Sequence, residues 1–232
     1  MASPDIEIGA SPFSLEHFEK VGPLNRLLFF FVRVFGTAVM YVCFRYVARS
    51  RPRLEDGQPY IIAANHISFL DPPALQAAFR RRIFYLMTER IYRQPAVGWF
   101  FRFCRVIPVR QGSMNRQSLV AARKLLSRGQ VVGIFPEGGI SRSGELRRGH
   151  PGIASLVLET RVPVIPAAIF GTRNALPAGS LLPRPKAVRV VFGEPLNFDD
   201  LPEVQDRAAR RVQLREVTER IMTKIAELQT HA

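Results

Sequence analysis

Short apolar runs alternate with helical segments along most of this 232-residue chain, and the alternation restricts the possible folds more than any other feature. The runs with strand character lie near residues 60–64, 83–87, 106–109, 130–135, 163–169 and 187–192. Helical segments lie between them, near 72–80, 95–103, 115–128 and 151–160. Strands that alternate with helices in this way are typical of α/β domains. We therefore expect an α/β fold with a single mixed sheet flanked by helices.

A histidine and an aspartate follow the first of these strands. His66 and Asp71 are separated by four residues, and Asp71-Pro72-Pro73 predicts a helix N-cap with proline at the first helical position. Loops at the carboxyl ends of strands are where open α/β sheets usually place their ligands. An imidazole oriented by a carboxylate is a general base, so the pair predicts acid/base chemistry. The spacing equally allows Asp71 simply to cap its helix while His66 binds a loop carbonyl.

A glycine-rich loop follows a second buried strand, the one near residues 130–135. It runs from Pro136 to Gly144 and carries Glu137 and Arg142. A turn of this kind lets a ligand approach backbone N–H groups, while Glu137 and Arg142 offer polar and charged contacts to a substrate headgroup. Taken alone, the segment could also be an ordinary glycine turn.

Together the two loops resemble those of the glycerolipid acyltransferase family, whose best-known members are the 1-acylglycerol-3-phosphate acyltransferases. The family's signatures, N-H-x-x-x-x-D and F-P-E-G, are intact at residues 65–71 and 135–138. Two further blocks of the family are recognisable at 106–109 and 162–166. The order and the separations of these blocks fit the family over a region from about residue 55 to about residue 195.

The resemblance implies an enzyme that moves a fatty acyl group from an acyl thioester to a hydroxyl of a lyso-glycerolipid, with 1-acylglycerol-3-phosphate as the first expectation, in phospholipid biosynthesis. His66, oriented by Asp71, would remove the proton of the acceptor hydroxyl without an acyl-enzyme, and the strand at 162–166 would line the acyl chain. The co-substrate would be acyl-CoA or an acyl carrier protein thioester, with no cofactor and no metal. The substrate-binding residues that we expect are Asn65, Arg110, Glu137, Gly138, Gly139, Ser141 and Arg142.

Two departures from the family pattern concern the acceptor. Ile140 stands where an arginine often follows the F-P-E-G signature, and Gln111 stands where the second block commonly has another. Both changes remove a cation from a position associated with the acceptor's phosphate, although Arg110, Arg142 and Arg147 lie close in sequence. The alternatives are therefore another lyso-phospholipid, a glycolipid or an aminolipid as acceptor.

A formal net charge of +14 indicates a polyanionic partner. The arginines form no recognisable recognition helix, and the chain has no RNA-binding signature or zinc-ligand spacing, so we expect no nucleic acid. Anionic membrane lipid and an acidic acyl carrier protein fit the charge better. A basic membrane- or nucleic-acid-binding protein without chemistry is the non-enzyme alternative, and the lack of a G-x-S-x-G motif disfavours a hydrolase.

An apolar segment at residues 27–44, interrupted by Arg33 and flanked by basic residues, indicates how the chain meets a membrane. An arginine near the bilayer centre costs about 2.5 to 3.5 kcal/mol on insertion scales, so we expect partial burial at the cytoplasmic leaflet, as a monotopic or peripheral protein. With a helix near 14–21, the segment would form a helical membrane-associating module, residues 1–50, before the acyltransferase domain, residues 51–232. A core helix of the domain is the alternative.

The two cysteines and the last helix are expected inside the fold. Cys43 and Cys104 have apolar or aromatic neighbours and no metal-ligand spacing, which indicates reduced core residues in a cytosolic compartment. Apolar residues from Leu214 to Leu228 recur at three- and four-residue steps. This spacing predicts an amphipathic helix packed on the domain.

Overall fold

The computed structural model of the protein describes residues 22–109, 116–180 and 182–230. Within these ranges seven strands form one sheet in the order β1-β7-β6-β2-β5-β3-β4. The strands are β1 (Val47–Arg49), β2 (Tyr60–Ala64), β3 (Ile83–Thr88), β4 (Ile107–Val109), β5 (Val131–Ile134), β6 (Val164–Phe170) and β7 (Arg189–Phe192). Neighbouring strands are parallel except β6 and β7, so β7 and β1 run against the other five. The expected single mixed sheet is confirmed.

The central strands form because their sequences are continuous apolar runs. Every residue of β2 and β5 is buried, and β6 is buried from Val164 to Ile169. Parallel strands that are covered on both faces carry such runs, since they have no side that faces solvent. All six expected strands are present, within two residues of their predicted bounds.

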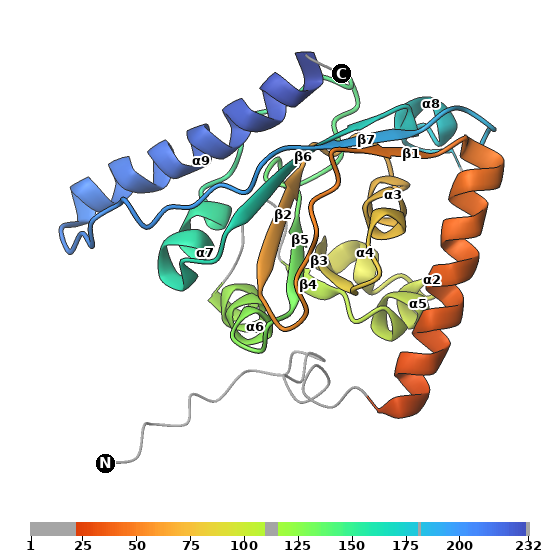
Figure 1. Ribbon diagram of the computed structural model, residues 1–232, viewed down its shortest axis with the longest axis horizontal. Helices are drawn as coiled ribbons and strands as arrows, with labels where there is room; N and C mark the ends of the chain where they lie inside the picture. The colour runs from red at the N-terminus through yellow and green to blue at the C-terminus, as the bar shows by residue number, and fades with distance from the viewer. Residues whose placement is uncertain (1–21, 110–115, 181, 231–232) are drawn as a thin grey trace.

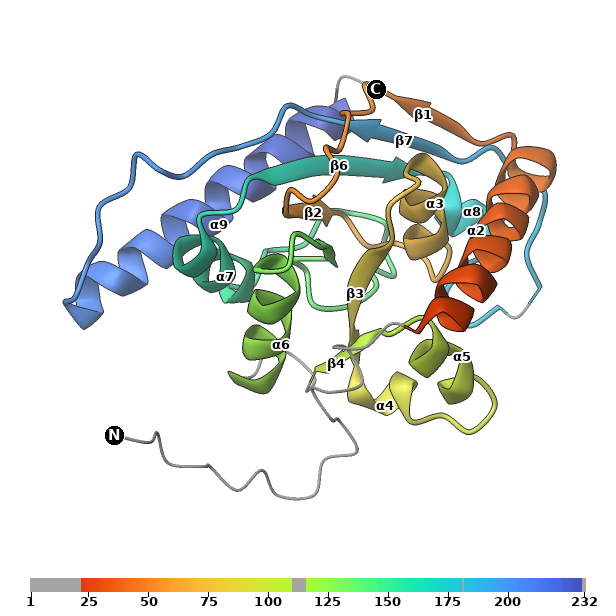
Figure 2. The ribbon, with the colours of Figure 1, turned by 60° about the horizontal axis from the view of Figure 1, so that its bottom comes forward.

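Helices cover both faces of the sheet (Figures 1 and 2). They are α2 (Pro23–Phe44), α3 (Asp71–Ala78), α4 (Glu89–Tyr92), α5 (Gly98–Phe103), α6 (Arg116–Leu126), α7 (Gly152–Thr160), α8 (Thr172–Ala175) and α9 (Arg207–Thr230). Residues of α6, α7 and α9 form the core on one face, and residues of α2, α3 and α8 form the core on the other. The short helices α4 and α5 lie near the β3–β4 edge and beside the amino-terminal part of α2 (Figures 1 and 2).

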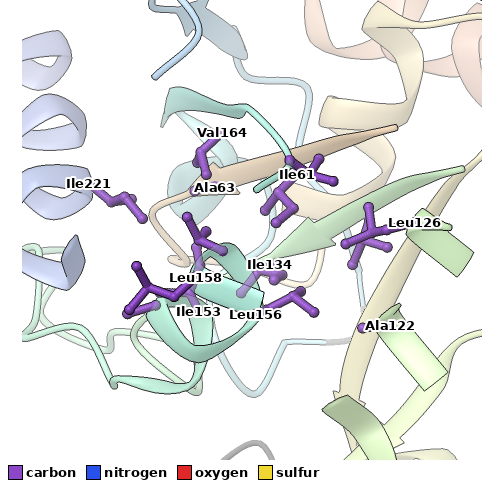
Figure 3. Packing of buried hydrophobic residues seen from close by; sticks show 14 of the residues in the cluster. Ile61, Ala63, Ala122, Leu126, Ile134, Ile153, Leu156, Leu158, Val164 and Ile221 are labelled. Atoms are coloured by element: carbon purple, nitrogen blue, oxygen red, sulfur yellow. The ribbon is translucent and has the colours of Figure 1, made fainter. Parts of the chain in front are cut away.

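The face covered by α6, α7 and α9 holds a continuous apolar core (Figure 3). Ile61 from β2, Leu126 from α6, Ile153 from α7 and Ile221 from α9 are all buried there. Val217 is buried in the same cluster, one helical turn before Ile221. The apolar stripe of α9 therefore packs inside the fold, which confirms the expected amphipathic helix.

Three short elements were not predicted by the sequence pattern: β1, α4 and α8. The expected helix at 95–103 begins at Gly98, and a separate helical turn, α4, precedes it. β1 has only three residues, with exposed ends, and it lies at the edge of the sheet, where its backbone pairs with β7. Elements this short depend on tertiary pairing rather than on a local pattern.

The long helix α2 places most of its apolar side chains on the outside. Only Met40 and Phe44 of its 22 residues are buried, so it is not the core helix that was the alternative interpretation. By length and composition alone α2 could cross a membrane. Cys43 is exposed on this helix, which contradicts its expected core position, and Cys104 is half-buried. The local sequence around Cys43 is apolar, but the side of α2 that carries it faces away from the sheet.

The end of α2 is joined directly to the sheet. Arg45 ends the helix in the left-handed conformation, and the buried Tyr46 donates its hydroxyl to the carbonyl of Ala74 in α3 at 2.7 Å. Val188, just before β7, donates its N–H to the carbonyl of Phe44 at 2.9 Å and accepts the N–H of Val47 at 3.0 Å. The expected helix at 14–21 lies outside the described residues. The division into segments 1–50 and 51–232 stays a prediction. β1 belongs to the first segment and is one of the strands of the sheet.

Candidate active site

The two motif loops meet at one edge of the sheet because their strands are neighbours. β2 and β5 pair in parallel with Ala63 opposite Ile134, so the residues that follow each strand emerge side by side. The His66 loop connects β2 to α3, and the loop that begins at Phe135 follows β5. The position at the carboxyl ends of parallel strands is as expected for a ligand site.

His66 and Asp71 are in direct contact. The Nδ1 atom of His66 lies 2.8 Å from Oδ2 of Asp71. Because a carboxylate can only accept, Nδ1 carries the proton in this contact, and in the neutral imidazole Nε2 then keeps its lone pair. The side chain of Asp71 is fully buried, whereas that of His66 is 15% exposed. The imidazole therefore presents an acceptor nitrogen toward accessible space while its other nitrogen is held.

Asp71 is fixed by four hydrogen bonds. Its Oδ2 accepts the backbone N–H groups of Ile67 at 2.7 Å and Ser68 at 2.8 Å besides the His66 ring, and its Oδ1 accepts the hydroxyl of Thr172 at 2.6 Å. A buried carboxylate with all of these donors is held in one orientation. The aspartate thus organises the whole loop between β2 and α3.

The expected N-cap role of Asp71 is wrong. Asp71 is the first residue of α3, Leu70 is the cap residue, and no side chain caps the helix. An N-cap at Asp71 would need the N–H of Pro73, which proline lacks, or that of Ala74, which already donates to the carbonyl of Leu70 at 2.9 Å. The carboxylate therefore turns back toward its own loop.

An aromatic ring supports the imidazole from the β5 side. The ring of Phe135 stacks on His66 with 4.1 Å between centroids and 16° between planes. The ring of Tyr85 in β3 is also nearly parallel to that of Phe135, with 6.1 Å between centroids, and its hydroxyl donates to the carbonyl of Pro72 at 2.9 Å. Burial raises the pKa of Tyr85 well above its ordinary value, so the hydroxyl remains protonated and neutral.

Glu137 joins the two loops. Its buried carboxylate accepts the backbone N–H of His66 at 2.7 Å through Oε1, and the backbone N–H of Arg147 at 3.0 Å through Oε2. The Nε of Arg147 lies 3.4 Å from Oε2, and its guanidinium also binds the carbonyls of Glu137 and Gly139. Ser141 closes the same connection by donating its N–H to the carbonyl of His66 at 2.7 Å. The glutamate therefore holds the backbone of the histidine, and a substrate contact by Glu137 stays a prediction.

Asn65 fixes the loop on its other side. Its amide nitrogen donates to the carbonyl of Ile169 at 3.1 Å, and its amide oxygen accepts the N–H of Ile169 at 2.7 Å. The side chain is buried and continues the pairing between β2 and β6 beyond the last strand residue. Asn65 thus binds the protein itself here, and its expected substrate contact stays a prediction.

The remaining expected residues differ in whether they line the cavity beside His66. Gly138 and Gly139 line the cavity beside His66. Gly138 has a φ of +69°, and a Cβ there would lie 2.8 Å from the ring of His150, so a larger residue would be both strained and crowded. Arg142 is exposed and does not line the cavity. Arg110 lies outside the described residues.

A cavity of about 630 Å³ opens beside His66. Its walls are mainly apolar, and they come from α2, α3, β3, α4, α5 and the loop after β5. Residues 162–166 do not line this cavity, since β6 lies in the sheet between β2 and β7, and their expected contact with the acyl chain stays a prediction. Among the described residues that line it, Arg33 is the one arginine. Within the described ranges no group of His, Cys, Asp and Glu side chains could hold a metal ion.

The contacts of four residues in the site were not predicted by the sequence. Thr172 binds Asp71 from a position 101 residues away in the chain, and no local pattern indicates this contact. Arg147 and His150 belong to the segment after the glycine-rich loop, where the backbone of His150 donates to the carbonyl of Pro136 at 2.8 Å and its side chain lines the cavity. Phe135 is part of the F-P-E-G signature, but its stacking on His66 follows only from the pairing of β2 with β5.

The sequence of the chain is similar to those of known proteins. A family model described as Acyltransferase matches residues 45–170. The chain is 29% identical over 157 residues to a 1-acyl-sn-glycerol-3-phosphate acyltransferase of Brassica napus, which covers 66% of the chain and 45% of that protein. It is 32% identical over 122 residues to a lyso-ornithine lipid O-acyltransferase of Pseudomonas aeruginosa, which covers 52% of the chain and 46% of that protein. The chain thus spans less than half of the length of these two relatives.

A solved structure has a similar fold. The 1-acyl-sn-glycerophosphate acyltransferase PlsC from Thermotoga maritima superposes with a TM-score of 0.66 at 22% sequence identity. The match covers 92% of this chain and 86% of the other. The sheet and its flanking helices are therefore shared with that protein.

Proposed function

Because the chain belongs to the Acyltransferase family, we propose that it transfers a fatty acyl group from a thioester to a hydroxyl of a lyso-lipid. The acceptor that we place first is 1-acylglycerol-3-phosphate, and the donor is acyl-CoA or an acyl carrier protein thioester. The observation that carries the proposal is the contact between His66, which lines an apolar cavity, and the buried Asp71. A base in the wall of an apolar cavity suits a reaction in which one substrate carries a long hydrocarbon chain.

The proposed reaction begins with the free Nε2 of His66. This atom takes the proton of the acceptor hydroxyl as the hydroxyl oxygen attacks the thioester carbonyl carbon. The tetrahedral intermediate collapses, the carbon–sulfur bond breaks, and the thiolate takes the proton back from the imidazolium. Ester and thiol are the products, and Asp71 stabilises the imidazolium while both are formed.

The walls of the cavity support an acyl chain as one occupant. Val32 and Gly36 from α2, Met87 from β3 and Phe100 from α5 are among its apolar lining residues. Burial of a methylene group contributes about 0.8 kcal/mol, so a fatty chain in this space would be held mainly by the hydrophobic effect. The polar end of the substrates would then lie beside Gly138, Gly139 and His66.

A second class of acceptor is supported by the residues around His66. Ile140, which lines the cavity, stands where the family often places an arginine, and Arg142 does not line the cavity. A headgroup without a phosphate monoester needs fewer cations. We therefore propose lyso-aminolipids or lyso-phosphodiesters as the second candidates.

The test is to incubate the purified full-length protein with labelled acyl-CoA and a panel of lyso-acceptors, and to identify the products. The panel contains lysophosphatidate, a lyso-phosphodiester and a lyso-aminolipid, each at equal concentration in mixed micelles. The first proposal expects lysophosphatidate to give the largest kcat/KM, and the second expects another acceptor to do so. His66→Ala serves as the control for each acceptor. Release of free fatty acid with no acylated lipid would contradict the transferase proposal.

We also propose that α2 and the positive charge hold the protein at the cytoplasmic face of a membrane rich in anionic lipid. The exposed apolar side chains of α2 and the net charge of +14 support this location. Sedimentation with vesicles of anionic or zwitterionic lipid measures the two contributions. Equal binding to both kinds of vesicle would contradict the electrostatic part.

A further inference from the structure

A second group of exposed apolar side chains lies on the segment from Glu89 to Cys104, which contains α4 and α5. Trp99 is 62% exposed, and Val97 and Phe100 beside it are also exposed. The indole N–H of Trp99 donates to the carbonyl of Ala96 at 3.1 Å, so the polar atom of the ring is already satisfied. Large aromatic side chains that gather on one surface mark a contact with another phase or another molecule.

This surface and the exposed face of α2 border the same cavity. Figures 1 and 2 show α5 beside the amino-terminal part of α2. Residues of both helices line the same cavity, Val32 and Arg33 from α2 and Phe100 and Phe101 from α5. The two exposed apolar surfaces therefore border the cavity from two sides.

The charges around α4 and α5 favour an anionic partner. Arg90, Arg93 and Arg102 are exposed, and Glu89 is the one acidic residue of the segment. Arg93 pairs with Glu89, which leaves a surplus of positive charge next to the aromatic side chains. Tryptophan next to arginine is the composition typical of the membrane–water interface.

We propose that the segment 89–104 is a second membrane-contacting surface, and that it and α2 enter the lipid together on the two sides of the cavity. The partner that we propose for this surface is an anionic bilayer that contains the lipid substrates. The inference rests on the proposed function only in this choice of partner. Acyl chains would then pass into the cavity sideways from the bilayer, between α2 and α5, without crossing water. Residues 27–44 alone would not provide this path.

The chain contains its own probe for this surface, because Trp99 is its one tryptophan. The full-length protein is mixed with anionic vesicles whose acyl chains carry bromine atoms, and the tryptophan emission is recorded. Insertion of α5 should shift the emission to shorter wavelength and quench roughly half of it or more, as expected for an indole at the interface. An emission that vesicles leave unchanged would overturn the inference.

A matched control moves the probe to the opposite side of the sheet. Val212 of α9 is 65% exposed, so Trp99→Phe combined with Val212→Trp keeps one exposed tryptophan in the chain. Its emission should not change when vesicles are added. Equal quenching at both positions would show non-specific adsorption and would also overturn the inference.

A substitution tests whether the surface contributes to binding. Trp99→Gln alters an exposed side chain, so the fold should be retained, and circular dichroism checks this. Binding of the variant to anionic vesicles should be weaker by about threefold to tenfold, as expected for one interfacial aromatic side chain. Unchanged binding would count against the proposal.

Two further readings separate the possible outcomes. If light scattering shows a dimer and Trp99 emits at short wavelength only when the dimer forms, a second copy covers the surface and the inference fails. Acyl transfer to a lyso-acceptor in detergent micelles is measured on the same samples. Transfer without quenching of Trp99 would refute the second surface and leave the proposed function standing, whereas quenching without transfer would do the reverse.

Discussion

The two helical layers of this protein use apolar residues in opposite ways. On the layer of α6, α7 and α9, the apolar side chains of α9 face the sheet, and Val217 and Ile221 are completely buried. On the other layer, Phe35 and Val42 of α2 are 72% and 80% exposed. The first layer completes the interior of the fold, whereas the second leaves an apolar surface to be covered by something else.

The candidate active site lies on the side of the sheet that is covered by α2, where apolar side chains are exposed. His66 borders a cavity whose walls include α2, while Asp71 behind it is completely enclosed. The polar part of the site is thus fixed by hydrogen bonds. The apolar part is formed in part by helices that also carry exposed apolar side chains. This contrast separates positions that should control chemistry from positions that should control access.

The largest effect is expected at the enclosed pair. His66→Ala should lower kcat/KM by about 10² to 10⁴-fold, because general base catalysis typically contributes that much. Asp71→Asn should lower it severely as well, since the amide can no longer accept from all of its present donors. Steady-state kinetics with a labelled acyl thioester measure both, and circular dichroism checks the fold. Near-normal turnover in a folded His66→Ala protein would rule out this mechanism.

The two cysteines should react at very different rates. Burial raises the pKa of the Cys104 thiol to about 11, above its ordinary 9.0, whereas Cys43 is exposed on α2. At pH 8 the thiolate fraction of Cys104 is then about a hundredfold below that of a thiol with the ordinary value. Mass spectrometry after brief treatment with iodoacetamide should find Cys43 modified and Cys104 intact.

The labelling of the two cysteines can also be compared in the presence and absence of vesicles. If α2 enters the lipid, anionic vesicles should slow the labelling of Cys43, while raising the pH toward 11 should speed the labelling of Cys104. The single variants Cys43→Ser and Cys104→Ser assign each product. Equal labelling of both cysteines at pH 8 would contradict the difference between the two environments.

A matched pair of valines compares the two layers directly. Val217→Ala should destabilise the protein by about 2 to 3 kcal/mol, because the substitution removes buried methyl groups and leaves a cavity. Val42→Ala should change stability by less than about 0.5 kcal/mol, as is usual for an exposed position. Urea unfolding in the absence of lipid measures both. A similar cost at the two sites would mean that α2 is covered in solution.

A smaller effect on activity than at the His66–Asp71 pair is expected at Thr172, which supports the aspartate. Thr172→Val removes the hydroxyl that donates to Oδ1 of Asp71 at 2.6 Å, and a hydrogen bond to a charged group contributes about 1.5 to 3 kcal/mol. We expect kcat to fall by about tenfold with little change in the KM of the donor, which would mark an effect on orientation rather than binding. Thr172→Ser keeps the hydroxyl and should restore most of the activity. Failure of serine to do so would indicate a packing role instead.

Much of the sheet follows from the sequence, because buried parallel strands are continuous apolar runs that can be read locally. The contact between His66 and Asp71 was also within reach, since both residues belong to one short loop. The full set of donors to Asp71 was not within reach, because it includes the hydroxyl of Thr172, which lies far away in the chain. Which side of an apolar helix faces outward is likewise set by the rest of the fold, and this is why Cys43 was misplaced.

If α2 holds the protein at a membrane, as we propose, the junction between α2 and β1 would set the distance between His66 and the lipid surface. The backbone bonds of Phe44 and Val47 to Val188 allow little hinge movement where the helix meets the sheet. A protein anchored in a bilayer by α2 would therefore keep His66 at a constant distance from the plane of the bilayer. Its substrates would search in two dimensions rather than three, and each would need to rise by the same short distance to react. Insertion of flexible residues into this junction would allow the distance between His66 and the bilayer to vary.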